Sequence, residues 1–219
     1  LIGKEAGDVS QFDVEGTLRF NNGLVIVPLT ARQLAAIMEH AVGFDGVGHV
    51  TVGRFPQIAG MRFSFDPAAP PGQRVRSLAI VDDSGSVTDR VIERGVVVGD
   101  PDRRIKMVTL NFLANGGDGY PFPIPSADRV DLTGEDGQPN PPNPAFPDTN
   151  GNGRIDEPAL VDPGRTDFTA PGSEQDALAE YLAHFFGTAS FNEAETAPLD
   201  DLRVQNLGVS GKMDTIFGP

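Results

Sequence analysis

The sequence contains no cysteine and only three histidines. Without cysteine it has neither a thiol nucleophile nor a thiolate metal site. His40, His49 and His184 stand outside any Asp-x-His pair or Gly-Asn-His segment, so the ligand set of a two-metal hydrolytic site is missing. We expect each to be a surface or boundary histidine. No Gly-x-Ser-x-Gly segment occurs either, and we expect this chain on its own to be inactive as a catalyst.

Basic residues are also scarce. Lysine and arginine total 17 against 31 aspartates and glutamates, which gives a net charge of -14 and a pI near 4.5. Binding to DNA, RNA or an anionic membrane requires clustered positive charge, so this composition argues against nucleic acid polymers as partners. No apolar run is long enough to span a bilayer. The 219 residues, 39% of them hydrophobic, can support one sizeable core or two small ones.

The hydrophobic patterns predict an α+β fold. Residues 24–29 form an apolar strand that leads into a helix beginning at Thr30, where Thr30 and Gln33 fit a capping box. Apolar residues recur at helical spacing after Gln33 and predict a face that packs on a sheet. Further strands are predicted at 75–81 and 96–98, and a half-buried strand is predicted from the alternation of Met61, Phe63 and Phe65.

A late helix is predicted between Ser173, a suitable N-cap, and Gly187, which follows its last turn. Its apolar residues predict a buried face. They are Tyr181, Leu182, Phe185 and Phe186.

Residues 111–120, NFLANGGDGY, combine features that suit ligand binding. A strand-like approach over 105–113 runs into three glycines that surround Asp118, and glycine permits both positive φ and close approach of the backbone. Asp118 can accept hydrogen bonds, and Phe112 offers a ring face for stacking. The alternative is a strand followed by a tight turn, with Phe112 in the core and Asp118 capping the turn.

Two other segments accompany this one. They are residues 18–34, LRFNNGLVIVPLTARQL, and residues 53–63, GRFPQIAGMRF. In order and spacing, the three segments resemble the C-terminal domain of the 5′-nucleotidase family, which also includes UDP-sugar hydrolases and 2′,3′-cyclic-nucleotide phosphodiesterases. The resemblance covers residues 12–120 and resumes near Ala177.

The resemblance implies layered mixed sheets and helices that hold a nucleoside between two phenylalanines, here Phe20 and Phe112. It further implies that Asp118 contacts the nucleoside and that Asn111 lies beside the stacked ring. The family's separate N-terminal metallophosphoesterase domain carries two divalent metal ions and cleaves the phosphate ester. The implied parent is thus an extracellular or periplasmic hydrolase of nucleotide catabolism. The alternative for Phe20 is an ordinary core phenylalanine.

The sequence departs from the family pattern in three places. Arg19 replaces the common proline before Phe20, and Ala31 stands where the family usually has glycine after Leu-Thr. The upstream Asn-Gly-Gly-(Gly/Ile)-Arg segment, which supplies further ligand contacts, is missing. We therefore expect the site in this chain to be incomplete.

Within a single predicted domain, 1–219, residues 121–172 read as a long loop insertion rich in Pro, Gly, Asp and Asn. The insertion contains a D-x-[DN]-x-[DN]-G pattern that predicts a structural Ca²⁺ site. The twelfth position is Ala159, not the bidentate glutamate of an EF-hand, so weak affinity is expected; the alternative is an Asn/Gly-rich turn with no ion. The predicted ligands are Asp148, Asn150, Asn152, the Arg154 carbonyl and Asp156.

Two functions are consistent with these patterns. The first is nucleotide or nucleoside recognition for a 5′-nucleotidase-type hydrolase. The second is a calcium-stabilised extracellular interaction module that keeps the scaffold without binding nucleotides. The discriminating feature is whether the rings of Phe20 and Phe112 face each other across an open cleft, as the first function requires, or are buried in separate cores.

Overall fold

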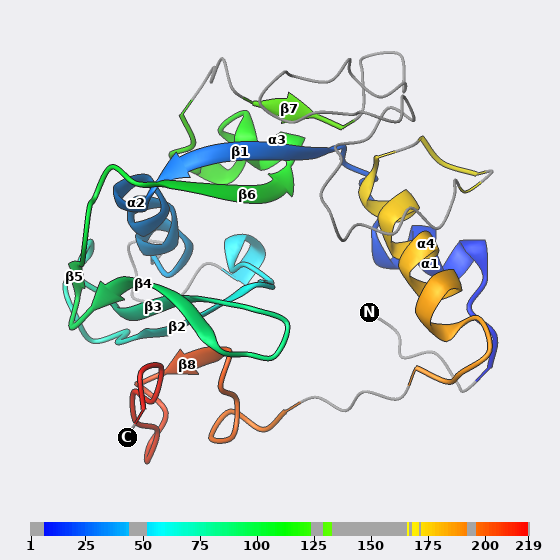
Figure 1. Ribbon diagram of the computed structural model, residues 1–219. Helices are drawn as coiled ribbons and strands as arrows, with labels where there is room; N and C mark the ends of the chain where they lie inside the picture. Colours follow the sequence, from blue (N-terminus) through cyan, green and yellow to red (C-terminus); the bar gives the residue numbers. More distant parts are fainter. Residues whose placement is uncertain are drawn as a thin grey trace. The chain divides into compact units, whose positions relative to one another are not determined.

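The computed structural model describes residues 7–43, 52–123, 129–132, 166, 168–170, 172–191 and 196–218. They form an α+β fold, as predicted. Its helices and strands, drawn in Figure 1, are α1 (Gln11–Thr17), β1 (Leu24–Thr30), α2 (Ala31–Ala41), the short 3₁₀ helix η1 (Val52–Arg54), β2 (Met61–Phe65), β3 (Val75–Val81), β4 (Val87–Glu93), β5 (Val96–Val97), β6 (Arg104–Leu110), α3 (Asn111–Ala114), the 3₁₀ turn η2 (Gly117–Gly119), β7 (Val130–Asp131), α4 (Glu174–Phe186) and β8 (Val204–Asn206).

The chain divides into two compact units, each assembled from separated segments. Unit 1 comprises Leu1–Pro28, Lys106–Gly117 and Ile124–Glu193. Unit 2 comprises Leu29–Ile105, Asp118–Pro123 and Ala194–Pro219. The chain passes from one unit to the other within β1, within β6, after Gly117, after Pro123 and after Glu193.

Unit 2 is built on a five-stranded sheet with the order β5-β4-β3-β2-β8. Neighbouring strands are antiparallel except β2 and β8, which are parallel. The predicted strands at 61–65 and 75–81 are confirmed as β2 and β3, and β5 occupies two of the three residues predicted at 96–98.

Helix α2 covers this sheet by packing on β3, β4 and β5. The predicted capping box is confirmed, because the Thr30 hydroxyl accepts from the Gln33 amide and the Gln33 side chain accepts from the Thr30 amide. The apolar face is buried as predicted, and each large side chain on it contributes about 1.5–3 kcal/mol relative to exposure. The buried residues are Ala31, Leu34, Ile37, Met38 and Ala41.

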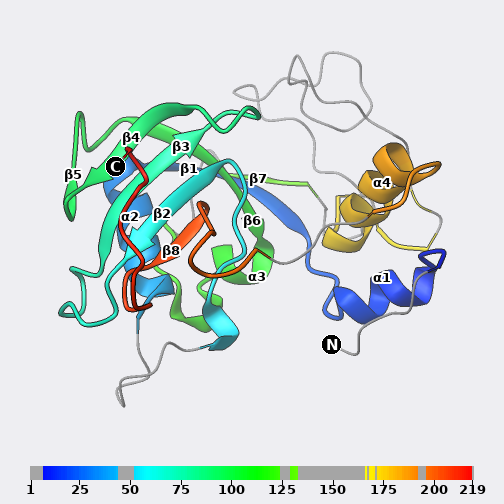
Figure 2. The same cartoon turned by 90° about the horizontal axis from the view of Figure 1, so that it is seen from below.

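The opposite face of the sheet is covered as well. Side chains alternate along a strand, so Ser64 lies on the other face from Phe63 and Phe65, and all three are buried. The Asp214 carboxylate accepts hydrogen bonds from Ser64 Oγ at 2.8 Å and from Ser77 Oγ at 2.7 Å. The segment after β8, which Figure 2 shows running across the strands, thus covers the face of β2 that carries Ser64. Strand β2 is therefore buried on both faces. The sequence had predicted a half-buried strand.

Unit 1 contains most of a three-stranded sheet with the order β6-β1-β7. Strand β1 pairs antiparallel with β7, with Val25 opposite Asp131 and Ile26 opposite Val130. Helices α1 and α4 of the same unit pack against each other. The predicted strand at 24–29 is confirmed as β1.

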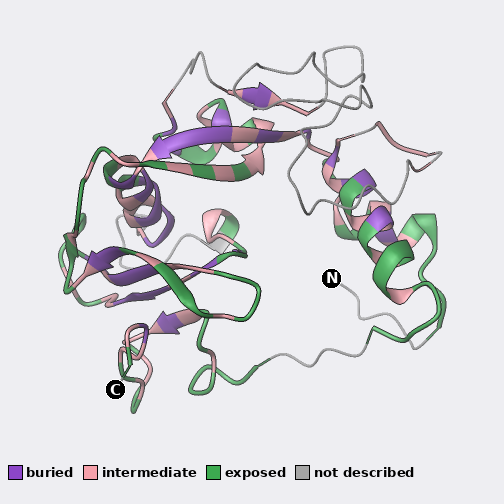
Figure 3. Ribbon diagram, in the orientation of Figure 1, coloured by how far each residue is buried: buried purple, intermediate pink, exposed green. Residues whose placement is uncertain are grey.

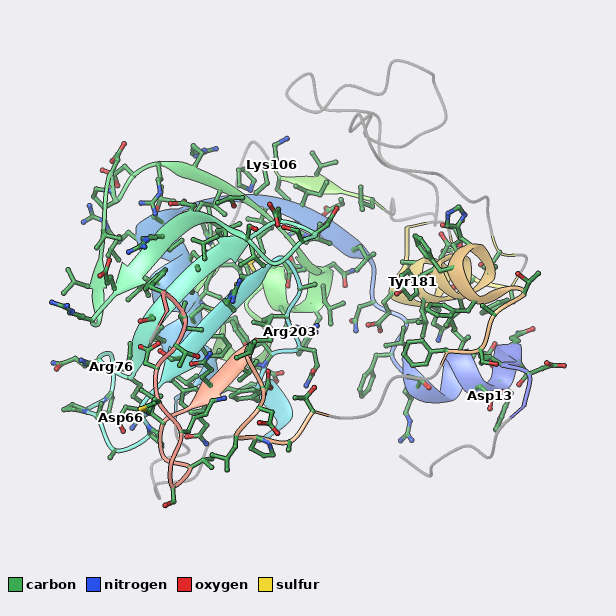
Figure 4. All side chains as sticks on the ribbon, turned by 60° about the horizontal axis from the view of Figure 1, so that its bottom comes forward. Asp13, Asp66, Arg76, Lys106, Tyr181 and Arg203 are labelled. Carbon is green, nitrogen blue, oxygen red and sulfur yellow. The ribbon has the colours of Figure 1, made fainter. Side chains whose placement is uncertain are left out.

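Helix α4 begins and ends where the sequence predicted, with Ser173 as N-cap and Gly187 directly after Phe186. The predicted buried face is wrong. Tyr181, labelled in Figure 4, and Phe185 are 46% and 58% exposed, whereas Leu182 and Phe186 are only partly buried.

The buried residues of α4 lie mainly in its first half, as the colouring of Figure 3 shows, and they are polar: Gln175, Asp176 and Glu180. The Asp176 carboxylate accepts from the Gly172 amide at 2.9 Å and from Thr166 Oγ1 at 2.9 Å, and Gln175 Nε2 donates to the Leu18 carbonyl at 2.8 Å. These hydrogen bonds fix the rotation of the helix and leave its aromatic side chains outward.

The predicted insertion, residues 121–172, lies largely outside the described residues. Within it the structure describes β7 and a few residues near the start of α4. The single-domain organisation and the bounds of the insertion therefore stay predictions.

Candidate functional site

Two loops of unit 1 meet at one end of the three-stranded sheet, where β6 ends and β1 begins. Figure 1 shows β1 and β6 running in opposite directions, so the start of β1 lies beside the end of β6. The Asn111 amide, directly after β6, donates to the Gly23 carbonyl, directly before β1, at 2.8 Å. This hydrogen bond brings together the loop that carries Phe20 and the turn that begins with Phe112.

Both phenylalanines are open to solvent. Phe20 is 84% exposed and Phe112 is 50% exposed, and neither ring contacts another aromatic ring in the part of the chain that the structure describes. By contrast, the rings of Phe63 and Phe65 in the core are almost fully buried. The core alternative considered for Phe20 and Phe112 is therefore wrong. Their predicted role in stacking stays a prediction.

Gly117 determines where the Phe112 ring lies. A Cβ atom at Gly117 would stand 2.5–2.6 Å from three atoms of that ring, which is too close for two carbon atoms. The ring therefore rests directly against the backbone of the glycine turn. Asn111 supports the same segment, because its Oδ1 accepts from the Phe112 amide at 2.8 Å. Its Nδ2 group is a further donor, and the role predicted for Asn111 beside a stacked ring stays a prediction.

The Phe20 loop is held by residues that the sequence analysis did not identify. The amide and Nδ2 of Asn22 donate to Glu174 Oε1 at 2.9 Å and 3.2 Å. Asn21, which adopts a positive φ of 46°, donates from Nδ2 to Thr169 Oγ1 at 2.7 Å. Arg19, which replaces the family's common proline, is exposed. These contacts fix the loop against the start of α4. In the sequence, the acidic first turn of that helix was the only signal that could have indicated them.

Asp118 lies in a left-handed turn at the start of a segment of unit 2. Its φ and ψ are 54° and 18°, which is unusual for a residue other than glycine. Its side chain is exposed, and none of the described residues donates a hydrogen bond to its carboxylate. An exposed carboxylate can accept a hydrogen bond from an outside donor, and the predicted contact of Asp118 with a nucleoside stays a prediction.

The backbone of this turn is held from two sides. His40 Nε2 lies 2.9 Å from the Asp118 carbonyl oxygen, and Tyr120 OH donates to the Arg54 carbonyl at 2.5 Å. Burial raises the pKa of Tyr120 to about 12, with a smaller increase from the charge of Asp118 and an opposing effect from Arg54. His40 is partly buried, which agrees with its prediction as a boundary residue, but its contact with Asp118 was not predicted.

No group of three or more His, Asp or Glu side chains in the described segments is placed to hold a metal ion. His184 is exposed on α4, with its ring edge-to-face with Phe185 at 4.5 Å, whereas His49 lies outside the described residues. The predicted calcium ligands Asp148, Asn150, Asn152, Arg154 and Asp156 also lie outside them, so that site stays a prediction. Over the same described residues, no helix combines the length and apolar character needed to cross a membrane.

Comparisons with known proteins agree with the resemblance noted from the sequence. The chain is 30% identical over 118 residues to the "Trifunctional nucleotide phosphoesterase protein YfkN" of Bacillus subtilis (strain 168), covering 54% of this chain and 7% of that protein. It is 25% identical over 119 residues to "Protein 5NUC" of Lutzomyia longipalpis, covering 52% of this chain and 19% of that protein. The chain thus spans less than a fifth of the length of these curated relatives.

The fold is similar to that of a solved 5′-nucleotidase precursor from Thermus thermophilus, with a TM-score of 0.54 and 23% identity over 91% of this chain and 28% of that one. The sequence model of the family described as "5'-nucleotidase, C-terminal domain" matches residues 2–124, which is more than half of the chain. The chain therefore belongs to the family of 5′-nucleotidase C-terminal domains.

Proposed function

We propose that this chain recognises the nucleoside part of the substrate for an exported 5′-nucleotidase-type phosphoester hydrolase, whose two-metal catalytic site is supplied by a separate N-terminal domain. The observation that carries the proposal is the solvent exposure of Phe20 and Phe112 on two loops joined by the hydrogen bond from Asn111 to Gly23. Exposed phenylalanines on fixed loops are suited to a ligand with a flat, apolar face.

The energetics support stacking as the main source of affinity. A nucleobase stacked on an aromatic side chain contributes about 1–3 kcal/mol, and the interaction tolerates different bases because each base has a π-face. Covering the two rings also removes apolar surface from water, which stabilises the complex by about 25 cal/mol for each Å² buried. Recognition by Phe20 and Phe112 would therefore be strong enough for a nucleoside and weakly selective among bases.

Selectivity would come from Asp118. An ionised carboxylate only accepts hydrogen bonds, so its partner must be a donor such as a ribose hydroxyl or an exocyclic amine. A site that provides such an acceptor discriminates against analogues without the donor. Asn111 would add its Nδ2 group as a donor beside the stacked ring.

The names of the relatives support the class of substrate. One is a trifunctional nucleotide phosphoesterase and another is a 5′-nucleotidase precursor. Both names describe whole proteins, of which this chain spans 7% and 28%. The chain alone would then bind without hydrolysing, in an extracellular or periplasmic compartment.

Isothermal titration of adenosine, AMP and uridine into the wild type, Phe20→Ala and Phe112→Ala tests the proposal. Each substitution is expected to weaken nucleoside binding about 5- to 150-fold, which corresponds to the stacking energy of one base. Phe185→Ala, which removes an exposed ring from α4, is the matched control and should bind like the wild type.

Two results would count against nucleoside recognition. Equal losses in Phe185→Ala and Phe112→Ala would show that binding is not located on the predicted pair of rings. The absence of heat with all three compounds in the wild type would instead favour the interaction module.

A further inference from the structure

His40 of α2 contacts the turn that carries Asp118. Its Nε2 lies 2.9 Å from the Asp118 carbonyl oxygen, although the two residues are 78 positions apart in the sequence. A carbonyl oxygen can only accept a hydrogen bond, so Nε2 carries the proton and donates it. Helix α2 is fixed by its capping box and by its buried apolar face, which makes it a rigid base for this contact.

The imidazole ring is also packed against the residues that follow Asp118. The ring of Tyr120 meets it edge-to-face at 4.8 Å between centroids. A Cβ atom at Gly119, where φ is 74°, would lie 3.3 Å from His40 Cε1, so the turn approaches the ring closely. The Tyr120 hydroxyl, bonded to the Arg54 carbonyl, anchors the end of the same turn.

The turn needs such support because Asp118 adopts a left-handed conformation, with φ 54° and ψ 18°. For a residue other than glycine this conformation costs about 1–2 kcal/mol, and it persists where surrounding contacts hold it. No described residue donates a hydrogen bond to the Asp118 carboxylate, so the contacts that hold this residue act on its backbone.

We propose that His40 is a positioning residue for nucleoside recognition. Its hydrogen bond to the Asp118 carbonyl holds the turn in the conformation that presents the Asp118 carboxylate to the ligand. The inference rests on the proposed function, because it takes Asp118 as a contact to the nucleoside. It adds a residue from α2 that makes no ligand contact itself and acts through Asp118.

A double-mutant cycle between His40 and Asp118 tests the inference. His40→Phe keeps an aromatic ring against Tyr120 but removes the donor, and His40→Gln restores an N–H donor. Both are made in the wild type and in Asp118→Ala. His184→Phe, which changes an exposed histidine of α4, is the matched control. The readouts are adenosine affinity by calorimetry and, without ligand, the exchange rate of the Gly119 amide by NMR.

His40→Phe should weaken adenosine binding about 3- to 10-fold, the range expected for one hydrogen bond, and should speed Gly119 exchange. His40→Gln should recover part of both effects. In the Asp118→Ala background His40→Phe should leave adenosine affinity unchanged, because a residue that acts through Asp118 has no effect once that carboxylate is gone.

Equal losses of affinity in both backgrounds would overturn the inference, because they would indicate general damage to the fold. Unchanged affinity in His40→Phe, with Phe112→Ala still weakening binding, would overturn it while leaving the proposed function intact. If the wild type binds no adenosine, the proposed function fails. The exchange rate of the Gly119 amide then decides whether His40 holds the turn. An unchanged rate in His40→Phe would overturn that role as well.

Discussion

At the scale of single residues, the absence of a side chain at Gly117 lets the Phe112 ring pack directly against the glycine turn. We expect Gly117→Ala to displace the Phe112 ring, because the added Cβ would lie 2.5–2.6 Å from it. Phe112 is half-exposed and can move, so the free energy of unfolding should change by less than about 1 kcal/mol. Adenosine affinity should fall about as far as in Phe112→Ala, within the stacking range of about 1–3 kcal/mol.

Calorimetric titration with adenosine measures this effect, and urea unfolding checks the fold. Gly16→Ala is a suitable control, since a Cβ there meets nothing within 4 Å. Wild-type affinity in Gly117→Ala would show that the position of the Phe112 ring does not matter for binding.

Because of Tyr120, we expect the free energy of unfolding to depend on pH in the alkaline range. Its pKa in the folded chain is raised to about 12 by burial, whereas an unfolded tyrosine titrates near pH 10. The unfolded state therefore loses this proton first as the pH rises. The stability that Tyr120 contributes is complete below about pH 10 and is lost between about pH 10 and pH 12.

Urea unfolding at about pH 8 and about pH 11 tests this linkage. The wild type should lose more stability between the two conditions than Tyr120→Phe, which has no ionisable hydroxyl. Tyr181→Phe should behave like the wild type, because Tyr181, the other tyrosine of the chain, is 46% exposed. Identical losses in the wild type and Tyr120→Phe would contradict the prediction.

The sequence indicates candidate residues for the site but not the contacts that hold them in place. Phe20, Phe112 and Asp118 stand out through motifs that are local in sequence. The supports are distant: Asn22 meets Glu174 across 152 positions and His40 meets Asp118 across 78. Without a fold, nothing in the pattern around His40 distinguishes a turn support from an ordinary boundary histidine.

At the scale of elements, helix ends were predicted more reliably than helix faces. Thr30 and Ser173 act as N-caps as expected, because capping depends on residues within one turn. The buried face of α4 was predicted wrongly because polar residues are buried through partners outside the helix. Gln175 donates to Leu18, 157 positions away, and Asp176 accepts from Gly172 and Thr166, which precede the helix. Apolar spacing alone carries no information about such partners.

The predicted calcium loop is an element that metal addition can test. Millimolar Ca²⁺ should raise the melting temperature of the wild type, because an ion that binds only the folded state stabilises it. Asp148→Ala should abolish most of this rise, since Asp148 would be the first oxygen ligand. Differential scanning calorimetry with Ca²⁺, Mg²⁺ or EDTA provides the measurement.

Asp136→Asn, in the same predicted insertion but outside the motif, is the control for lost negative charge. A rise in melting temperature that is equal in Asp148→Ala and the wild type would indicate that calcium, if it binds, binds elsewhere.

At the scale of the whole molecule, the net charge of -14 bears on which ligands bind. Adenosine is neutral, whereas AMP carries a phosphate that an acidic surface repels. Raising the salt from about 50 mM to about 500 mM screens this repulsion. AMP affinity should therefore rise a few-fold with salt, and adenosine affinity should stay within about twofold.

Titrations at the two salt concentrations measure this difference. A fall in AMP affinity with salt would contradict the prediction and would indicate a cationic contact to the phosphate. The exposed Arg19 beside Phe20 would then be the first side chain to replace.

The two-sided burial of β2 has a consequence for how the protein is made. Strand β8 and Asp214 both follow residue 203, yet β8 completes the edge of the five-stranded sheet and Asp214 accepts the hydrogen bonds of Ser64 and Ser77. While the ribosome is still translating residues 65–200, the edge of β2 has no partner and these serines lack their acceptor. Unit 2 is therefore expected to reach its native state late in synthesis, and a nascent chain arrested before residue 204 should be sensitive to protease and bound by chaperones that recognise unpaired strands.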